Sequence, residues 1–219
     1  MSKIQEMIDR MCPDGVEYKR LSEVSIQLNG MNGVSKKWEE QGNCRFIDYL
    51  NVYNNISVDT SKLPYATVKS IEKQTVLQKG DILFTSASET PDECALSAAI
   101  EKDLPEGILL DDHLFGIRVK NDYIDKVHPG YLKYLFRSSE TRIVINKTVR
   151  GVTRFYISKS NFMDIEIPVP PIEVQREIVK VLDYFSELAA ELAAELAARK
   201  KQYEYYRDNL LNFQRGGAK

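Results

Sequence analysis

The chain has 219 residues, of which 43% are hydrophobic, and a formal net charge of −2. This length allows one domain with its own core and one further extended element. Three cysteines at wide spacings argue against a disulfide framework and against a zinc site. The chain starts without an apolar signal region, and glutamates interrupt its Leu- and Ala-rich stretch, so we expect a cytoplasmic protein with no membrane span.

The first half of the chain predicts short elements of mixed type. Residues 1–10 predict an amphipathic helix with Ile4, Met7, Ile8 and Met11 on one face. Residues 16–24 carry the chain into the domain, and residues 25–45, rich in Gly, Asn and Lys, predict a loop. Short strands are expected over residues 46–53, 76–78, 82–85, 109–110 and 114–119.

The second half predicts a helix and then a hairpin. Residues 129–142 predict a helix that turns Tyr131, Tyr134, Leu135 and Phe136 inward. Residues 143–149 and 152–157 flank Gly151 as two strands, and residues 158–163 lead into a proline-rich segment. The fold class that we expect is α+β, with a β-rich mixed head.

A long C-terminal helix follows the prolines. Pro168 and Pro170 hold the backbone extended, and Pro171 stands where a helix can begin without cost. From there to about Phe213 the chain has no Gly or Pro and contains three Glu-Leu-Ala-Ala units. A helix of about 43 residues is roughly 64 Å long, more than a head with a radius of gyration of about 15 Å can cover.

One face of this helix has the spacing of a coiled-coil seam. Apolar residues recur at intervals of four and three, interrupted by Arg199, and the predicted partner-helix residues are Ile178, Leu182, Phe185, Leu192, Leu196, Tyr203, Tyr206 and Leu210. The first half of the helix is acidic and the second half basic, which favours antiparallel pairing with a partner. The alternative is that the apolar stripe docks on the chain's own head.

Catalytic motifs are missing from the sequence. It has no GxxxxGK[ST] phosphate loop and no Asn/Asp-Pro-Pro-aromatic motif of amino-methyltransferases. Asp14, Glu17 and Lys19 are too close in sequence to surround a metal ion from separate strands. Asp111, Asp112 and His113 are interpreted as a turn or a satisfied polar cluster, in preference to a metal site. We therefore expect a non-catalytic protein without a metal site.

Charge along the head suggests a nucleic-acid surface. Residues 126–159 hold eight Lys and Arg against one Glu, whereas residues 164–195 hold eight Asp and Glu against two basic residues. The predicted DNA-binding residues of the hairpin region are Lys147, Arg150, Thr153, Arg154 and Tyr156, while Val149, Val152, Phe155 and Ile157 are expected to fill the core. The alternative is an ordinary solvated basic face.

A second candidate cluster lies in the predicted loop. It consists of Lys36, Lys37, Trp38 and Arg45, and Ser86 and Ser88 add neutral hydroxyl groups elsewhere. The alternatives are a disordered loop with Trp38 packed on the core, and a simple turn at the two serines.

The proline-rich run Ile167-Pro168-Val169-Pro170-Pro171-Ile172-Glu173-Val174-Gln175, followed by a long helix, resembles the conserved region of type I restriction-modification specificity subunits. Cys12-Pro13-Asp14-Gly15, Phe46-Ile47-Asp48-Tyr49, Lys79-Gly80-Asp81-Ile82 and Gly151 through Ser158 are similar to further landmarks of that family, in the same order. Full-length members carry two recognition domains and two long helices, and this chain carries one of each. The resemblance implies a target-recognition domain over 1–167, a spacer and dimerisation helix over 168–215, and a flexible tail over 216–219.

The resemblance also implies partners. A specificity subunit reads one half of a bipartite target on double-stranded DNA and positions methyltransferase and motor-nuclease subunits. S-adenosylmethionine, ATP and Mg would act on those partner subunits, with no cofactor bound by this chain, which would form a homodimer. Two other functions stay open: an anti-restriction half-subunit that competes for methyltransferase subunits, and a coiled-coil adaptor that binds nucleic acid without sequence preference.

Overall fold

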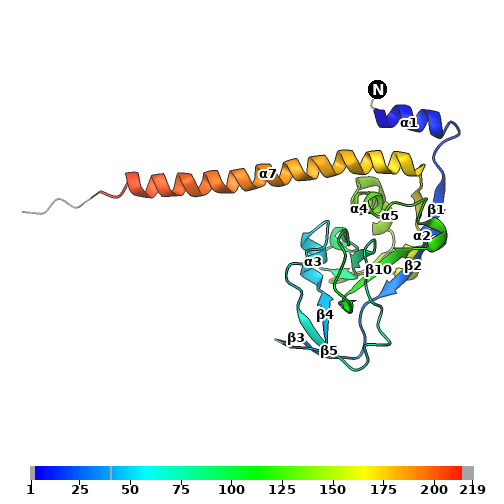
Figure 1. The fold of residues 1–219 in the computed structure, drawn as a ribbon, viewed down its shortest axis with the longest axis horizontal. Helices are drawn as coiled ribbons and strands as arrows, with labels where there is room; N and C mark the ends of the chain where they lie inside the picture. Colours follow the sequence, from blue (N-terminus) through cyan, green and yellow to red (C-terminus); the bar gives the residue numbers. More distant parts are fainter. Residues whose placement is uncertain (1–2, 40, 214–219) are drawn as a thin grey trace, which may run out of the picture. The chain divides into compact units, whose positions relative to one another are not determined.

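The computed structural model describes residues 3–39 and 41–213 of the chain. The chain divides into two compact units, residues 1–179, which we call the head unit, and residues 180–219, which we call the helical unit. The predicted tail, residues 216–219, lies outside the described residues. Figure 1 shows the elements in chain order.

The chain enters the head unit through a helix and an edge strand. The predicted N-terminal helix is confirmed as α1 (Lys3–Met11). β1 (Tyr18–Arg20) pairs antiparallel with β13 (Glu166–Pro168), and α2 (Leu21–Val24) follows it. The ion pair between Lys3 Nζ and Glu177 Oε1, at 2.8 Å, joins α1 to the first turns of the C-terminal helix.

A four-stranded antiparallel sheet, in the order β2-β10-β6-β8, forms the centre of the head unit. Its strands are β2 (Ser25–Asn29), β10 (Leu114–Val119), β6 (Ile82–Thr85) and β8 (Ser97–Ala99). The predicted strands over 82–85 and 114–119 are confirmed. Phe84 packs against three other aromatic rings of the core. Its ring centroid lies 5.1 Å from that of Phe115 and 4.9 Å from those of Phe136 and Phe162.

The loop predicted over residues 25–45 is wrong. β2 pairs with β10 along five residues, and β3 (Val34–Glu39) pairs with β5 (Tyr65–Val68). Gly, Asn and Lys are poor strand formers, but pairing with a distant strand supplies the backbone hydrogen bonds and outweighs this local preference. β2 buries Leu28 in the core, an inward residue among polar neighbours.

A second four-stranded sheet, in the order β3-β5-β4-β9, lies in the head unit away from the helices α4 (Pro129–Leu135) and α5 (Ser139–Asn146) (Figure 1). β4 (Cys44–Ile47) runs parallel to β9 (Ile108–Leu110). The strand predicted over 46–53 is wrong beyond Ile47, because the Asp48 side chain accepts a hydrogen bond from Asn51 N at 2.7 Å and starts α3 (Tyr49–Asn54). Residues 76–78 form no strand, although Leu77 N donates to Ile108 O at 2.9 Å.

The predicted hairpin around Gly151 is confirmed, but its second strand is shorter than predicted, because residues 152–154 form the bend at its tip. β11 (Val149–Gly151) pairs with β12 (Phe155–Ile157), which pairs with β7 (Ala87–Ser88). Gly151 has φ +127°, and a Cβ there would lie 2.1 Å from Arg154 O, so this tight tip requires glycine. The expectation that Val152 fills the core is wrong: it lies at the tip and is 88% exposed.

The helix predicted over 129–142 is two helices, α4 (Pro129–Leu135) and α5 (Ser139–Asn146). Ser138 caps α5 by accepting a hydrogen bond from Thr141 N at 3.4 Å. The strand predicted over 143–149 is therefore wrong for residues 143–146, which continue α5. Three short elements complete the unit: η1 (Pro91–Glu93), η2 (Asn121–Tyr123) and α6 (Lys159–Met163).

The predicted long helix is confirmed as α7 (Ile172–Leu210), of 39 residues, which begins directly after Pro171. Gln175 anchors its first turns. The buried amide donates to Lys126 O and Pro170 O, both at 2.7 Å, and accepts from His128 N at 2.8 Å. All of its polar atoms are therefore satisfied inside the head unit, with Val174 and Val179 buried beside it. The expected α+β class with a long C-terminal helix is confirmed.

Candidate nucleic-acid interface

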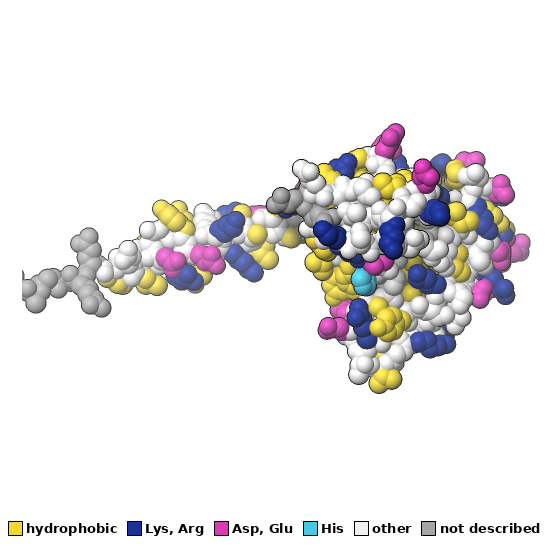
Figure 2. Space-filling model, turned by 90° about the horizontal axis from the view of Figure 1, so that it is seen from below, with side chains coloured by type: hydrophobic (Ala, Val, Ile, Leu, Met, Phe, Trp, Pro, Cys, Tyr) yellow, Lys and Arg dark blue, Asp and Glu magenta, His cyan; other side chains and the backbone are white. Residues whose placement is uncertain are grey.

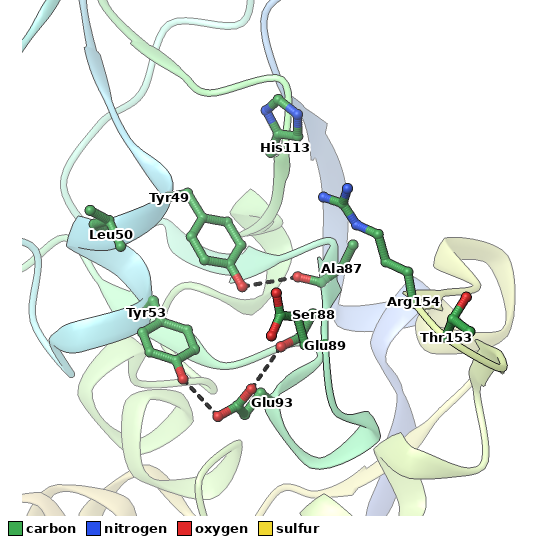
Figure 3. Close-up of a pocket in the computed structure, with 10 residues that line it drawn as sticks. All are labelled: Tyr49, Leu50, Tyr53, Ala87, Ser88, Glu89, Glu93, His113, Thr153 and Arg154. Carbon is green, nitrogen blue, oxygen red and sulfur yellow. Dashed lines mark hydrogen bonds between the residues drawn. The ribbon is translucent and has the colours of Figure 1, made fainter.

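A cleft of about 770 Å³ opens on the head unit (Figure 3). α3 supplies Tyr49, Leu50 and Tyr53 to one wall. The other side comes from β7 with the residues after it, from η1, from the hairpin tip, and from His113 ahead of β10; its residues are Ala87, Ser88, Glu89, Glu93, His113, Thr153 and Arg154. Segments far apart in the sequence thus meet around one opening.

One wall of the cleft is fixed by a hydrogen-bonded carboxylate. Glu93 accepts from Tyr53 Oη at 2.7 Å and from Ser88 Oγ at 2.8 Å, and Tyr49 Oη donates to Ala87 O at 3.0 Å. The two tyrosine rings stack with their centroids 5.8 Å apart. The hydrogen bonds from Tyr53 and Ser88 lower the pKa of Glu93 and keep it ionised. The hydroxyl group of Ser88 is engaged in this network.

The hairpin presents its cations in different directions. Thr153 and Arg154 are exposed and line the cleft, and the Arg154 guanidinium lies 5.8 Å from the Tyr156 ring centroid. Lys147 lines a separate depression of about 460 Å³ together with Asp164 and Glu166. Arg150 donates to Lys147 O and Val149 O, both at 3.0 Å. The structure therefore brings Thr153 and Arg154 to the cleft and leaves Lys147 outside it.

Several cations of the basic segment 126–159 are structural. Arg137 donates to Ser97 O and Asn55 O, and Arg142 donates to the carbonyl groups of Asp92, Cys94 and Ala95. Burial lowers the pKa of both arginines. Lys133 is buried and pairs with Glu101 at 2.7 Å. The charge count along the sequence thus overstates the positive charge at the surface, because burial and pairing are not visible in it.

Lys37 lies in an ion-pair cluster beside the cleft. Its Nζ is 3.0 Å from Asp111 Oδ1, pairs closely with Asp112, and is 3.5 Å from His113 Nδ1. Burial works to lower the pKa of Lys37, but its hydrogen bonds with Asp112 and Asp111 raise it overall. The lysine supplies the positive charge that a metal ion at Asp111, Asp112 and His113 would otherwise supply.

His113 connects the two predicted clusters, because it contacts Lys37 and also lines the cleft with Arg154 of the hairpin.

The other predicted residues of the loop cluster differ in exposure. Trp38 is 61% exposed, has φ 62°, and sets its ring edge-on to Phe46 at 5.6 Å between centroids. Lys36 is exposed on β3, and Arg45 is half-buried on β4. Ser86 Oγ is buried without a hydrogen-bond partner among the described residues, which leaves its predicted DNA contact without an exposed hydroxyl.

Lys and Arg side chains are spread over the face of the head unit seen in Figure 2, while most of its Asp and Glu side chains lie toward the edges. Tyr49, Leu50, Glu89, Glu93 and His113 were not predicted as site residues. Tyr49 belongs to a family landmark and His113 to the polar cluster noted in the sequence, but neither signal predicts a cleft. The other three carry no signal in their own segments, and only the pairing of distant strands brings the five together.

The helical unit exposes much of the predicted seam. Phe185, Leu192, Leu196, Tyr203, Tyr206 and Leu210 are between 53% and 73% exposed. Ile178 belongs to the head unit and packs half-buried against its core. No helix in the described part of the chain has the length and apolarity that a membrane span needs.

Residues 13–199 match the family model described as the type I restriction modification DNA specificity domain. The chain is 26% identical, over 80% of its length, to a putative type I restriction enzyme specificity subunit, MjaX, of Methanocaldococcus jannaschii, and covers 40% of that protein. A solved chain of a type I restriction-modification system is similar in fold, with TM-score 0.65 and 18% identity over 95% of this chain and 50% of the other. The HsdS subunit of Thermoanaerobacter tengcongensis gives TM-score 0.58 and 19% identity, over 88% and 44%.

This chain therefore spans about half the length of the relatives that it matches. The family model covers most of the sequence, and the resemblance of the proline-rich segment and its neighbouring landmarks points to the same proteins. The chain belongs to the family of type I restriction-modification specificity subunits.

Proposed function

We propose that this chain recognises one half of a bipartite DNA target and acts as a homodimer. The observation that carries the proposal is the apolar seam of the helical unit, exposed over some 25 residues from Phe185 to Leu210 and attached to a head of the specificity-subunit family. Exposed apolar surface on this scale indicates a partner. A second copy of the same chain supplies a matching seam, and two-fold pairing is the commonest symmetry of such dimers.

Antiparallel pairing fits the charges of the helix. It brings Glu187, Glu191 and Glu195 of one copy near Arg199, Lys200, Lys201 and Arg207 of the other, whereas parallel pairing sets like charges against each other. These side chains are exposed, so the pairs select the orientation and contribute little to affinity. Two identical heads would then read the same half-site in inverted orientation, separated by a spacer of unspecified sequence.

In this proposal the cleft of the head unit faces DNA. Arg154 and Thr153 approach base edges, and the more distant Lys147 contacts phosphate. The chain itself performs no chemistry. Methyltransferase subunits would supply S-adenosylmethionine chemistry on adenine, and motor-nuclease subunits would supply ATP- and Mg-dependent cleavage, both positioned by the dimer.

Binding selection from a random-sequence duplex pool tests the recognition role. A selected inverted repeat with a fixed gap supports the proposal. Binding without any selected motif supports the non-specific adaptor, and absence of DNA binding together with tight binding to a methyltransferase subunit supports the anti-restriction role. Light scattering at micromolar concentration tests the dimer, and a monomer even in the presence of the methyltransferase subunit contradicts it.

A further inference from the structure

Glu89 lines the cleft together with Arg154. The paired strands β7 and β12 bring Ser88 opposite Phe155 and Ala87 opposite Tyr156. Glu89 and Arg154 are the next residues beyond the Ser88–Phe155 pair, so this register, extended past the ends of both strands, places them opposite each other. Cross-strand neighbours have Cβ atoms about 5 Å apart. Both residues are exposed and both line the cleft (Figure 3).

Among the residues that the structure describes, no ion pair joins Glu89 and Arg154. Arg154 is directed over the Tyr156 ring, and among the side chains that the structure describes none forms a hydrogen bond or ion pair with the Glu89 carboxylate. Nearby Glu93 differs in this respect, because Tyr53 and Ser88 satisfy it. Glu89 is thus the carboxylate of the cleft that is available to a ligand.

A free carboxylate in a DNA-binding cleft reduces affinity, because phosphates repel it. A carboxylate can make up for this lower affinity by adding selectivity for one base. In the major groove it accepts a hydrogen bond from the N4 amino group of cytosine, while arginine donates to O6 and N7 of guanine. Neighbouring acceptor and donor side chains of this kind match the two halves of one C·G pair.

We propose that Glu89 is a specificity-determining residue that accepts a hydrogen bond from a cytosine N4 amino group, with Arg154 on the guanine of the same base pair. This inference rests on the proposed DNA-recognition function. It concerns which base pair is read and by which groups, and it predicts a consequence that a structural role of Glu89 would not have. Glutamine prefers adenine, through N6 and N7, so Glu89→Gln should change the selected base.

The test is duplex-pool selection with the full chain, its Glu89→Gln variant and a Glu106→Gln control, which changes an exposed carboxylate outside the cleft. The unchanged chain and the control should select the same motif, with a C·G pair at one position. Glu89→Gln should shift the cytosine-to-adenine ratio at that position by about tenfold or more and leave the other positions unchanged.

A Glu89→Ala variant separates specificity from folding. It should bind random DNA at least as tightly as the unchanged chain, because the repulsion is gone, and lose its preference at the same position. Selection of the original motif by Glu89→Gln, or of a motif without a C·G pair by the unchanged chain, overturns the inference while the proposed function stands. If the unchanged chain selects no motif, the proposed function fails and the inference fails with it.

Discussion

Replacing Leu192 and Leu196 by alanine should dissociate the proposed dimer. The two side chains are 58% and 56% exposed, so a little over half of their surface remains to be buried by a partner. Each Leu→Ala change removes three carbon groups, worth about 0.8 kcal/mol each when fully buried, or about 1.4 kcal/mol for the exposed share. A symmetric dimer contains each leucine twice, which gives about 5 kcal/mol in total.

Because about 1.4 kcal/mol corresponds to a factor of ten, the dissociation constant should rise by three to four powers of ten. Sedimentation equilibrium over a wide concentration range measures this change. Alanine keeps the helix propensity, so circular dichroism should show unchanged helicity. Ala194→Ser, on the opposite side of the same turns, is the control and should leave dimerisation intact. An unchanged dissociation constant in the double variant would refute the role of this seam.

Three further results are expected. Arg154→Ala should reduce the free energy of DNA binding by roughly 1–3 kcal/mol and relax the preference at one base, whereas Lys147→Ala should weaken binding to all sequences alike and flatten its salt dependence. A binding titration at several salt concentrations distinguishes the two effects. Unchanged affinity in both variants would show that another surface reads the DNA. Gly151→Ala should lose DNA selectivity as strongly as Arg154→Ala, because its Cβ collides with Arg154 O; retained selectivity in pool selection contradicts the role of the tip. Deleting one Glu-Leu-Ala-Ala unit rotates the helix only about 40° out of phase and shortens it by about 6 Å. Both copies of the dimer carry the deletion, so the two heads approach each other by about 12 Å, and target mapping should show the same half-sites with a spacer about three to four base pairs shorter. An unchanged spacer would show that the helix is not a ruler.

Local sequence predicted those elements whose cause is local. α7 follows from a long run without Gly or Pro behind Pro171, and the Gly151 hairpin follows from turn chemistry. β6 and β10 are strongly apolar and were predicted with their bounds. In contrast, β2 and β3 are strands because they pair with the distant strands β10 and β5. The residue types over 25–39 give no indication of this pairing.

The site was less predictable than the fold for the same reason. Arg142 counts as a surface charge in the sequence, but it is a half-buried donor to three carbonyl groups in the structure. Lys37 was predicted to bind DNA, but in the structure its ammonium group forms ion pairs with Asp111 and Asp112. Glu89 became a candidate only because the structure places it in the same cleft as Arg154, next to the paired strands β7 and β12. Burial, pairing and register depend on contacts between distant segments, and charge patterns along a chain do not contain them.

Methylome sequencing of cells that carry this chain together with a type I methyltransferase subunit tests the central claim most directly. The account predicts new adenine methylation within an inverted repeat, interrupted by a gap of fixed length and unspecified sequence. The same cells with the Leu192→Ala and Leu196→Ala variant should lose this methylation. New methylation at an asymmetric or uninterrupted sequence, or none beyond that of cells without the chain, would contradict recognition by a symmetric dimer.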